Sequence, residues 1–321
     1  MTGLVTVDIA GAQMGGSARY AAELSRYLER TGRQDVQVIG AGQHVNPAWL
    51  LRRETRGPKS GRRVAVNNVS FIGPGGPRWA LLRNALHFLA DDEAASLDPA
   101  LRTSVRREAA VVRLAARRAD VLVVPCTAMA ERVARVMPAV QSRMVVRPHP
   151  VSAGPARPAA REAAILCPVL FAPYKQMDER LTEVLGAVDG YGDPAVRVRV
   201  TADRADLAPA VASSPRLEFL GRIDQRDLQQ AWARSRAIYF PTGLESFGYP
   251  LAEARANGQP VIARDTAQNR EIAGPALCGF DPAEPGSLRQ AVKSALTTVV
   301  APDPQPFDPD AYFGWLLGSA G

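Results

Sequence analysis

The sequence predicts an α/β protein made of two Rossmann-like domains, each with a parallel sheet. Short apolar runs alternate with helix-length amphipathic segments along the whole chain, which is the pattern of βαβ units. The chain has 321 residues, enough for two hydrophobic cores. Residues 148–158 contain four prolines and one glycine, a composition typical of a linker. We therefore expect domains at 1–149 and 150–302, followed by a connector and a terminal helix at 303–321.

The first domain opens with a strand, a glycine-rich turn and a helix. The apolar run 4–9 predicts the strand, residues 11–16 the turn, and Ser17 the cap of the helix. This order is the generic opening of a Rossmann-like unit. Gly15 and Gly16 would let backbone amides approach a phosphate, because no side chain obstructs them.

The remaining elements continue the alternation. In the first domain, strands are expected at 36–39, 64–71, 121–124 and 144–146, and helices at 104–118 and 127–137. In the second, strands are expected at 165–171, 196–200, 217–220, 238–240 and 260–263, and helices at 177–188, 227–234 and 251–256, before a terminal helix at 310–317. Residues 40–59 show loop and helix fragments without a clear period.

The composition is that of a soluble globular protein, with 46% apolar and 22% charged residues. No apolar run reaches the roughly 18 residues that span a bilayer. Met1 leads directly into a strand-like segment without a leader sequence, so we expect a cytoplasmic protein. Cys126, Cys167 and Cys278 are widely spaced in apolar surroundings, which favours reduced, buried thiols over a metal site or a disulfide.

The net charge of +7 comes mainly from arginine. Lys59, Lys175 and Lys293 are the lysines, so 36 of the 39 basic residues are arginines. This bias, together with abundant alanine and proline, is typical of a GC-rich genome and does not indicate a nucleic-acid partner. The arginine-rich runs 52–63 and 102–118 are either solvated faces or surfaces for anionic acceptors or lipid headgroups. Nothing in the sequence indicates the oligomeric state.

The stretch that follows the strand 238–240 carries the clearest chemistry. A glycine-containing loop leads to Pro250, which fits the start of a helix because its missing N–H needs no partner there. Loop amides and the N-terminus of a helix together form an anion site. Glu245 lies in the loop and Glu253 on the helix, with seven residues between them.

Two carboxylates in this arrangement suit a nucleotide-diphosphate sugar. Glu245 could accept hydroxyl groups of the sugar, and Glu253 could accept two adjacent hydroxyls of a ribose. The helix N-terminus between them would face the diphosphate. The alternative is a solvated helix with two surface glutamates, which the spacing alone does not exclude. The residues around the pair distinguish the two interpretations.

Those residues resemble the signature of glycosyltransferase family 4. The resemblance is carried by Glu245-Ser246-Phe247-Gly248-Tyr249-Pro250-Leu251-Ala252-Glu253 and by Ala256-Asn257-Gly258-Gln259-Pro260-Val261-Ile262, with the spacing intact. It implies a retaining enzyme of GT-B architecture, in which two Rossmann-like domains face each other across a cleft and a C-terminal helix crosses back to the first domain. It also implies an N-terminal acceptor-binding domain and a C-terminal nucleotide-sugar-binding domain. The implied acceptor is a hydroxyl group of a polysaccharide, glycolipid or natural product.

The same resemblance assigns roles to single residues. It implies that His87 hydrogen-bonds the transferred sugar near the anomeric carbon, that Lys175 contacts the diphosphate and that Glu245 holds the sugar. These three are the candidate catalytic residues. The family often has an arginine six residues before this lysine, where the present chain has Val169. The candidate donor-binding residues are Gly15, Gly16, Lys175, Arg222, Glu245, Ser246, Phe247, Gly248, Tyr249, Leu251 and Glu253.

We expect no metal ion and no cofactor apart from the donor substrate. The tripeptide Asp308-Pro309-Asp310 matches the metal–diphosphate motif of another glycosyltransferase fold, but its place before a helix favours a cap and turn. No isolated carboxylate suggests a covalent nucleophile. Front-face retention assisted by the leaving phosphate is therefore favoured over double displacement.

Other functions remain compatible with the sequence. A non-catalytic protein of the same fold could bind a sugar nucleotide or another anionic ligand, a reading that Val169 and the net charge favour. A pseudo-glycosyltransferase that moves a cyclitol, or a sugar phosphorylase, would share the fold. A nicotinamide-dependent dehydrogenase also contains glycine-rich βα units, but no G-x-G-x-x-G follows the first strand. The base and sugar of the donor, the acceptor and the pathway are not readable from the sequence.

Overall fold

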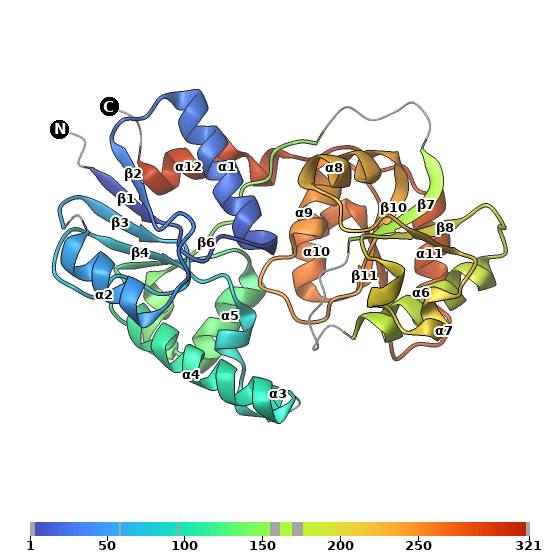
Figure 1. The fold of residues 1–321 in the computed structure, drawn as a ribbon, viewed down its shortest axis with the longest axis horizontal. Helices are drawn as coiled ribbons and strands as arrows, with labels where there is room; N and C mark the ends of the chain where they lie inside the picture. The colour runs from blue at the N-terminus through green and yellow to red at the C-terminus, as the bar shows by residue number, and fades with distance from the viewer. Residues whose placement is uncertain (1–3, 58, 96, 155–160, 169–175, 319–321) are drawn as a thin grey trace. The chain divides into compact units, whose positions relative to one another are not determined.

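The computed structural model describes residues 4–57, 59–95, 97–154, 161–168 and 176–318. Contacts divide the chain into two compact units, drawn in Figure 1. Unit 1 comprises Met1–Val151, Leu244–Phe247 and Phe307–Gly321, and unit 2 comprises Ser152–Gly243 and Gly248–Pro306. Each unit holds one six-stranded sheet, and the paired strands are parallel. The predicted α/β fold with two Rossmann-like sheets is confirmed.

Unit 1 is built on a sheet with the strand order β2-β1-β3-β4-β5-β6. Its strands are β1 (Val5–Asp8), β2 (Val36–Ile39), β3 (Arg62–Ala65), β4 (Arg78–Leu81), β5 (Val121–Val124) and β6 (Met144–Val146). The order reverses between β1 and β3, because the chain first adds β2 on one side of β1 and then returns to add β3 on the other. Open α/β sheets bind ligands at the carboxyl edge of such a point.

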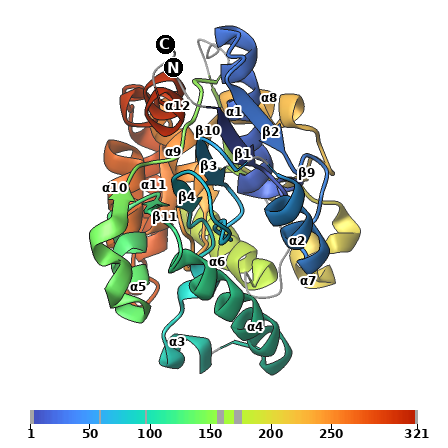
Figure 2. The ribbon, with the colours of Figure 1, turned by 90° about the vertical axis from the view of Figure 1, so that its left-hand side faces the viewer.

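Helices cover both faces of this sheet, as Figure 1 and Figure 2 show. On one face lie α1 (Gly15–Thr31) and α12 (Pro309–Leu317), and on the other α2 (Pro47–Arg56), α4 (Pro99–Ala116) and α5 (Thr127–Val136). The short helices of this unit are η1 (Ala85–Phe88), α3 (Asp91–Ala95) and η2 (Pro138–Arg143). Burial from both faces explains why an inner strand such as β5 is entirely apolar.

The first helix starts earlier than the sequence predicted. α1 begins at Gly15 with Met14 as its N-cap, so the prediction that Ser17 caps it is wrong. Gly15 takes a φ of +57°, which glycine tolerates, and the glycine pair therefore enters the first turn. The first helical hydrogen bond runs from Ala18 N to Met14 O at 3.4 Å. The amides of Gly15, Gly16 and Ser17 precede that bond, in the part of a helix where N–H groups have no intrahelical partner.

The C-terminal helix α12 belongs to unit 1, as predicted. Phe313 on α12 lies edge-on to Tyr20, with ring centroids 5.6 Å apart, and 5.2 Å from the ring of Tyr27. Both tyrosines are on α1, so aromatic packing joins the two helices. Asp308 accepts a hydrogen bond from Asp310 N at 2.8 Å, which confirms that this acidic tripeptide caps α12.

A buried ion pair fixes the carboxyl end of β1. Asp8 is fully buried and accepts hydrogen bonds from Arg53 Nη1 at 2.8 Å and from Asn67 Nδ2 at 2.9 Å. Trp49 Nε1 lies 3.3 Å from both carboxylate oxygens. Arg53 is also buried and donates a second hydrogen bond to Ser70 O at 2.7 Å. The pair thereby joins α2 to the loop after β3 and to the end of β1.

Unit 2 is built on a sheet with the strand order β12-β11-β10-β7-β8-β9. Its strands are β7 (Glu162–Cys167), β8 (Arg197–Val200), β9 (Leu217–Phe219), β10 (Ser235–Phe240), β11 (Val261–Arg264) and β12 (Leu277–Phe280). Its α-helices are α6 (Met177–Tyr191), α7 (Pro209–Ala212), α8 (Gln225–Arg234), α9 (Tyr249–Ala256), α10 (Ala267–Ala273) and α11 (Ser287–Thr297). Here the strand order reverses between β7 and β10.

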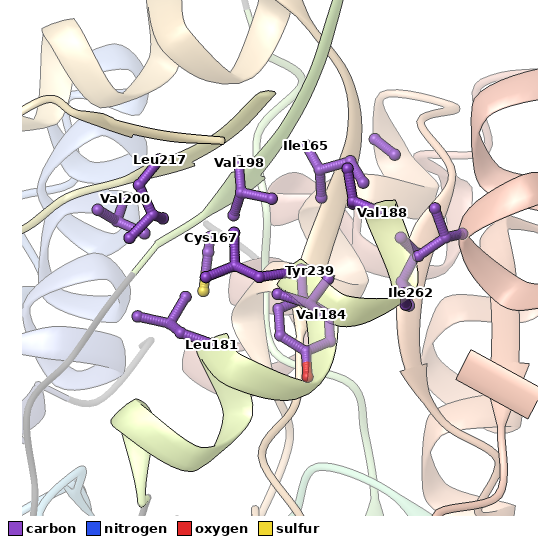
Figure 3. Close-up of a cluster of buried hydrophobic side chains, with 14 of the residues drawn as sticks. Ile165, Cys167, Leu181, Val184, Val188, Val198, Val200, Leu217, Tyr239 and Ile262 are labelled. Atoms are coloured by element: carbon purple, nitrogen blue, oxygen red, sulfur yellow. The ribbon is translucent and has the colours of Figure 1, made fainter. Parts of the chain in front are cut away.

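Figure 3 shows the core between α6 and this sheet. Leu181, Val184 and Val188 of α6 are fully buried among apolar side chains of the strands. They recur at the spacing of one helix face. The three cysteines of the chain are buried and form no disulfide with one another, as predicted. Among the described residues, no helix combines the length and the apolar character needed to cross a bilayer.

Removing Arg53 should strongly destabilise unit 1. Arg53→Met leaves Asp8 buried without its cationic partner, and breaking a buried ion pair from one side costs about 3–5 kcal/mol. Urea unfolding followed by circular dichroism should show that loss in the free energy of unfolding. Arg52→Met is the matched control, because Arg52 is exposed, and it should change the same quantity by less than about 0.5 kcal/mol. Equal effects of the two substitutions would refute the importance of the pair.

Candidate functional site

The predicted signature from Glu245 to Glu253 follows β10, an inner strand of the unit 2 sheet. β10 ends at Phe240, next to the point where the strand order reverses, and the chain continues through residues 241–248 into α9. Glu245 is half-buried in that loop, and Glu253 is half-buried on α9. Ligands bind at the carboxyl edge of parallel sheets because the strand-to-helix loops gather there.

Gly248 determines where α9 starts. Its φ is +82° and its ψ is 73°. A Cβ atom at this position would lie 2.9 Å from Leu251 Cδ1 and 3.2 Å from the Phe240 ring. Both the left-handed backbone and the close approach therefore require glycine. Pro250 follows in the first turn, where a missing N–H costs nothing, and the helix N-terminus carries partial positive charge.

The loop before α9 is fixed by hydrogen bonding and aromatic packing within unit 1, to which residues 244–247 belong. Ser246 Oγ donates a hydrogen bond to Arg83 O. Phe247 is buried against His149, with ring centroids 5.0 Å apart. The middle of the predicted signature thus has a fixed conformation.

Arg83, which the sequence analysis did not single out, connects this loop to the glycine turn. It follows β4, and its Nη2 donates a hydrogen bond to Gly16 O at 2.8 Å. Its guanidinium carbon lies 4.5 Å from the centroid of the Tyr20 ring. Its Nε donates to His149 Nε2 at 3.3 Å. Because Ser246 bonds to the Arg83 main chain, this residue brings together two predicted donor-binding segments, Gly16 and Ser246.

Asn68 shapes the turn that presents Arg83. Its φ is +69°, a left-handed conformation that is uncommon outside glycine. Its Oδ1 accepts hydrogen bonds from the backbone N–H groups of Arg83 and Asn84, the second at 3.1 Å. A short amide side chain suits both demands, because asparagine tolerates this backbone region and can bond locally.

His87, the predicted sugar contact, lies in η1 and is 6% exposed. Its Nε2 is 3.5 Å from Glu108 Oε2 on α4 and 3.3 Å from Asn84 Nδ2. Burial lowers the pKa of the His87 imidazole, and the Glu108 carboxylate partly offsets that effect. Within the described residues, none of the hydrogen bonds of His87 reaches Arg83 or Ser246. The structure therefore places this histidine against α4, outside the group that Arg83 assembles.

His149, for which the sequence offered no functional signal, lies at the centre of that group. It is 1% exposed, and its ring lies 5.5 Å from Tyr20 and 6.4 Å from Tyr312, between ring centroids. Burial, with a smaller effect of the Arg83 charge, holds the pKa of the His149 imidazole well below its ordinary value. A neutral imidazole can accept the hydrogen bond that Arg83 donates.

The other predicted residues are spread over the rest of the chain. Arg222, after β9, is exposed and forms an ion pair with Asp206 at 3.2 Å. Tyr249 is buried at the start of α9. Lys175 and Val169 lie outside the described residues. In the part of the chain that the structure describes, no three His, Cys, Asp or Glu side chains are arranged to hold a metal ion.

Parts of the chain are similar to known sugar-transferring proteins. Residues 205–299 match the family model described as "Glycosyl transferases group 1". A stretch of 81 residues, 25% of this chain, is 37% identical to 10% of the serotype-specific mannosyltransferase WbdA of Escherichia coli. A stretch of 131 residues, 39% of this chain, is 31% identical to 34% of the D-rhamnosyltransferase WbpZ of Pseudomonas aeruginosa. The chain thus spans between a tenth and a third of the length of these relatives.

Solved structures share the fold of nearly the whole chain. The UDP-forming trehalose-phosphate synthase of Burkholderia xenovorans has a TM-score of 0.65 at 11% identity, over 99% of this chain and 98% of its own. The fold is GT-B. The sucrose-phosphate synthase of Thermosynechococcus elongatus has a TM-score of 0.61 at 14% identity, over 99% and 95%. The pneumococcal O-GlcNAc transferase GtfA, solved with UDP and GlcNAc, has a TM-score of 0.51 at 12% identity, over 78% and 51%.

The buried histidines should make stability depend on pH. Burial lowers the pKa of His87 and of His149 in the folded protein, so the unfolded chain takes up protons first as the pH falls below about 6.5. The free energy of unfolding should therefore be unaffected by these histidines above about pH 7. It should decrease between about pH 6.5 and pH 5, by up to about 1.4 kcal/mol per pH unit for each histidine. His149→Gln should flatten this profile in urea unfolding, and the same change at the exposed His44 should not. An equally steep profile in both variants would argue against the assignment to His149.

Proposed function

We propose that the protein is a retaining glycosyltransferase that moves a sugar from a nucleotide-diphosphate sugar to a hydroxyl acceptor. The main support is the pair Glu245 and Glu253, one in the loop before α9 and one on α9, the helix that follows β10 in the chain. Both lie within residues 205–299, the segment that matches the glycosyl transferases group 1 model. A nucleotide sugar offers hydroxyl groups to two carboxylates and a diphosphate to the helix N-terminus between them.

Each part of the donor has a proposed contact. Glu253 accepts hydrogen bonds from two ribose hydroxyls, and Glu245 accepts them from the transferred sugar. The N-terminus of α9 and Lys175 face the diphosphate, where fixed positive charge is most useful. Unit 1 is proposed to bind the acceptor and to contribute the amides of Gly15 and Gly16.

The proposed chemistry separates charge. As the bond between the anomeric carbon and the diphosphate oxygen breaks, positive charge develops on the sugar and negative charge on the diphosphate. Protein cations and the helix dipole stabilise the leaving group, so we expect no metal ion to take part. The acceptor oxygen attacks from the face that the diphosphate leaves and gives its proton to a phosphate oxygen. Glu245 orients the sugar by hydrogen bonds and forms no covalent bond to it.

A panel of nucleotides tests the donor class. The relatives include a mannosyltransferase and a D-rhamnosyltransferase, and one structural neighbour was solved with UDP. UDP, GDP, dTDP and ADP should be compared by thermal shift, because a ligand that binds only the folded state raises the apparent stability. Stabilisation by one of them would support the proposal. Tighter binding of a nicotinamide dinucleotide than of all four would favour a dehydrogenase instead.

Glu253→Ala should weaken binding of the preferred nucleoside diphosphate. The substitution removes a charged acceptor from the ribose hydroxyls, which is worth about 1–3 kcal/mol. Isothermal titration calorimetry measures the loss directly. Glu284→Ala serves as the control, because Glu284 lies exposed in the loop before α11 and should bind like the wild type. Unchanged affinity in a folded Glu253→Ala protein would show that another group binds the ribose.

Substitutions of Glu245 should separate orientation from covalent catalysis. Glu245→Gln keeps one hydrogen-bond acceptor and the shape of the side chain, so it should retain measurable transfer, whereas Glu245→Ala should lose far more. NMR of the product should show the anomeric configuration of the donor. Mass spectrometry of the stalled enzyme should show no glycosyl adduct. An inverted product would overturn the retaining mechanism, and an adduct on Glu245 would make it a nucleophile.

A further inference from the structure

Arg264 ends β11 at the carboxyl edge of the unit 2 sheet. β11 pairs with β10, and the Arg264 side chain lies against Gly243 in the loop that follows β10. The approach is close, since a Cβ atom at Gly243 would lie 2.6 Å from Arg264 Nη1. Gly243 is two residues before Glu245. A cation therefore lies beside the start of the predicted sugar-binding loop.

This guanidinium is half-buried, and no described carboxylate forms an ion pair with it. Within the described part of the chain, its Nε is buried without a hydrogen-bond partner. Glu183, the carboxylate that acts on it, is already bound by Arg180 at 2.7 Å. Burial lowers the pKa of Arg264, and the nearby charge of Arg180 adds to the effect. The described residues thus hold a charge partly out of water and supply no anion to compensate for it.

Comparable arginines of unit 2 are neutralised within the fold. Carboxylates lie 2.7–2.9 Å from three of them: Glu218 from Arg199, Asp189 from Arg216 and Asp303 from Arg255. Desolvating a charge is costly unless an opposite charge and hydrogen bonds offset it. An anionic ligand would supply the negative charge and the hydrogen-bond acceptors that the described residues do not supply to Arg264.

Neighbouring elements relate this cation to the proposed diphosphate contacts. The Tyr239 hydroxyl of β10 donates a hydrogen bond to Arg180 O at 3.1 Å, so the first turn of α6 is joined to β10; Figure 3 shows Tyr239 beside α6. α6 begins at Met177, two residues after Lys175. The charges of Arg180 and Glu183 on this helix act on Arg264, which also lies beside Gly243 in the loop after β10.

We propose that Arg264 binds the diphosphate of the donor and supplies the positive charge that is missing at Val169. The inference rests on the proposed function, because it assumes a nucleotide-diphosphate ligand. A guanidinium can donate two parallel hydrogen bonds to phosphate oxygens, which a lysine cannot do. Its charge matters most when the diphosphate leaves, so Arg264 contributes to turnover as well as to binding.

Calorimetry with matched anions tests the assignment. The wild type, Arg264→Gln and Arg264→Lys are titrated with the preferred nucleoside diphosphate, the corresponding monophosphate and inorganic pyrophosphate. Arg264→Gln should lose roughly 10- to 100-fold in affinity for the diphosphate and for pyrophosphate. Its affinity for the monophosphate should fall by less than about threefold. Arg264→Lys should be intermediate, because the charge remains and the paired hydrogen bonds do not.

Arg270→Gln is the matched control. Arg270 lies on α10, is exposed and pairs with Asp265 at 2.6 Å, so it carries the same charge near the same strand with its partner already present. It should bind all three anions like the wild type. Equal losses in Arg264→Gln and Arg270→Gln would reduce the effect to net charge and overturn the proposal.

Gly243→Ala provides a second variant that leaves the arginine in place. The added methyl group would meet only the end of the Arg264 side chain, at 2.6 Å from Nη1 and 3.1 Å from Cζ. The side chain can move, so the protein should fold normally while the guanidinium is displaced. Diphosphate and pyrophosphate affinity should fall, and monophosphate affinity should stay near that of the wild type.

The outcomes separate this inference from the proposed function. If both Arg264→Gln and Gly243→Ala bind the nucleoside diphosphate as tightly as the wild type, the role of Arg264 is refuted and the glycosyltransferase proposal remains intact. Binding of pyrophosphate but of no nucleoside diphosphate, with loss in Arg264→Gln, would keep the anion site and overturn the donor class. No binding of any anion by the wild type would overturn both.

Discussion

The parallel arrangement of the strands is the constraint on which the rest of this structure depends. When all strands of a sheet run in one direction, every strand-to-helix loop emerges at the same edge. In unit 1 that edge collects the glycine turn after β1 and Arg83 after β4. In unit 2 it collects Gly243 in the loop after β10 and Arg264 at the end of β11. Residues far apart in the chain therefore meet at the carboxyl edge of each sheet.

The charged groups at these two sheet edges differ in whether other side chains neutralise them. At the end of β1, the buried Asp8 is matched by Arg53, Asn67 and Trp49, so the charge is compensated and the site is structural. At the end of β11, the half-buried Arg264 has no such partner among the described residues. A buried charge with hydrogen-bonded partners of opposite charge stabilises the fold. A partly buried charge without such a partner is a better candidate for ligand binding, because it gains most from a new anionic partner.

The elements that the sequence predicted best are short apolar runs between clear turn signals. The inner strand at 121–124 has the predicted bounds, and so do the largely exposed edge strands at 36–39 and 144–146. The strand predicted at 64–71 ends at Ala65, because Asn68 turns the chain with a φ of +69°. The helix α2 was not recognised, since its inward face includes the buried charge of Arg53 and not an apolar stripe.

The candidate site shows a similar division. The segment from Glu245 to Glu253 was recognisable because its meaning resides in local spacing, and Gly248 has the helix-starting role that this spacing suggests. The bond from Arg83 to Gly16 ends on a backbone carbonyl, which every residue has, so no sequence pattern records it. Arg264 is one of 36 arginines, and its neighbours in the sequence do not distinguish it. Only the folded chain shows that Glu183 is already bound and that Gly243 leaves room for the guanidinium beside the loop. Where a sequence is rich in one charged residue, function is therefore found by asking which of the charges the fold leaves without a partner.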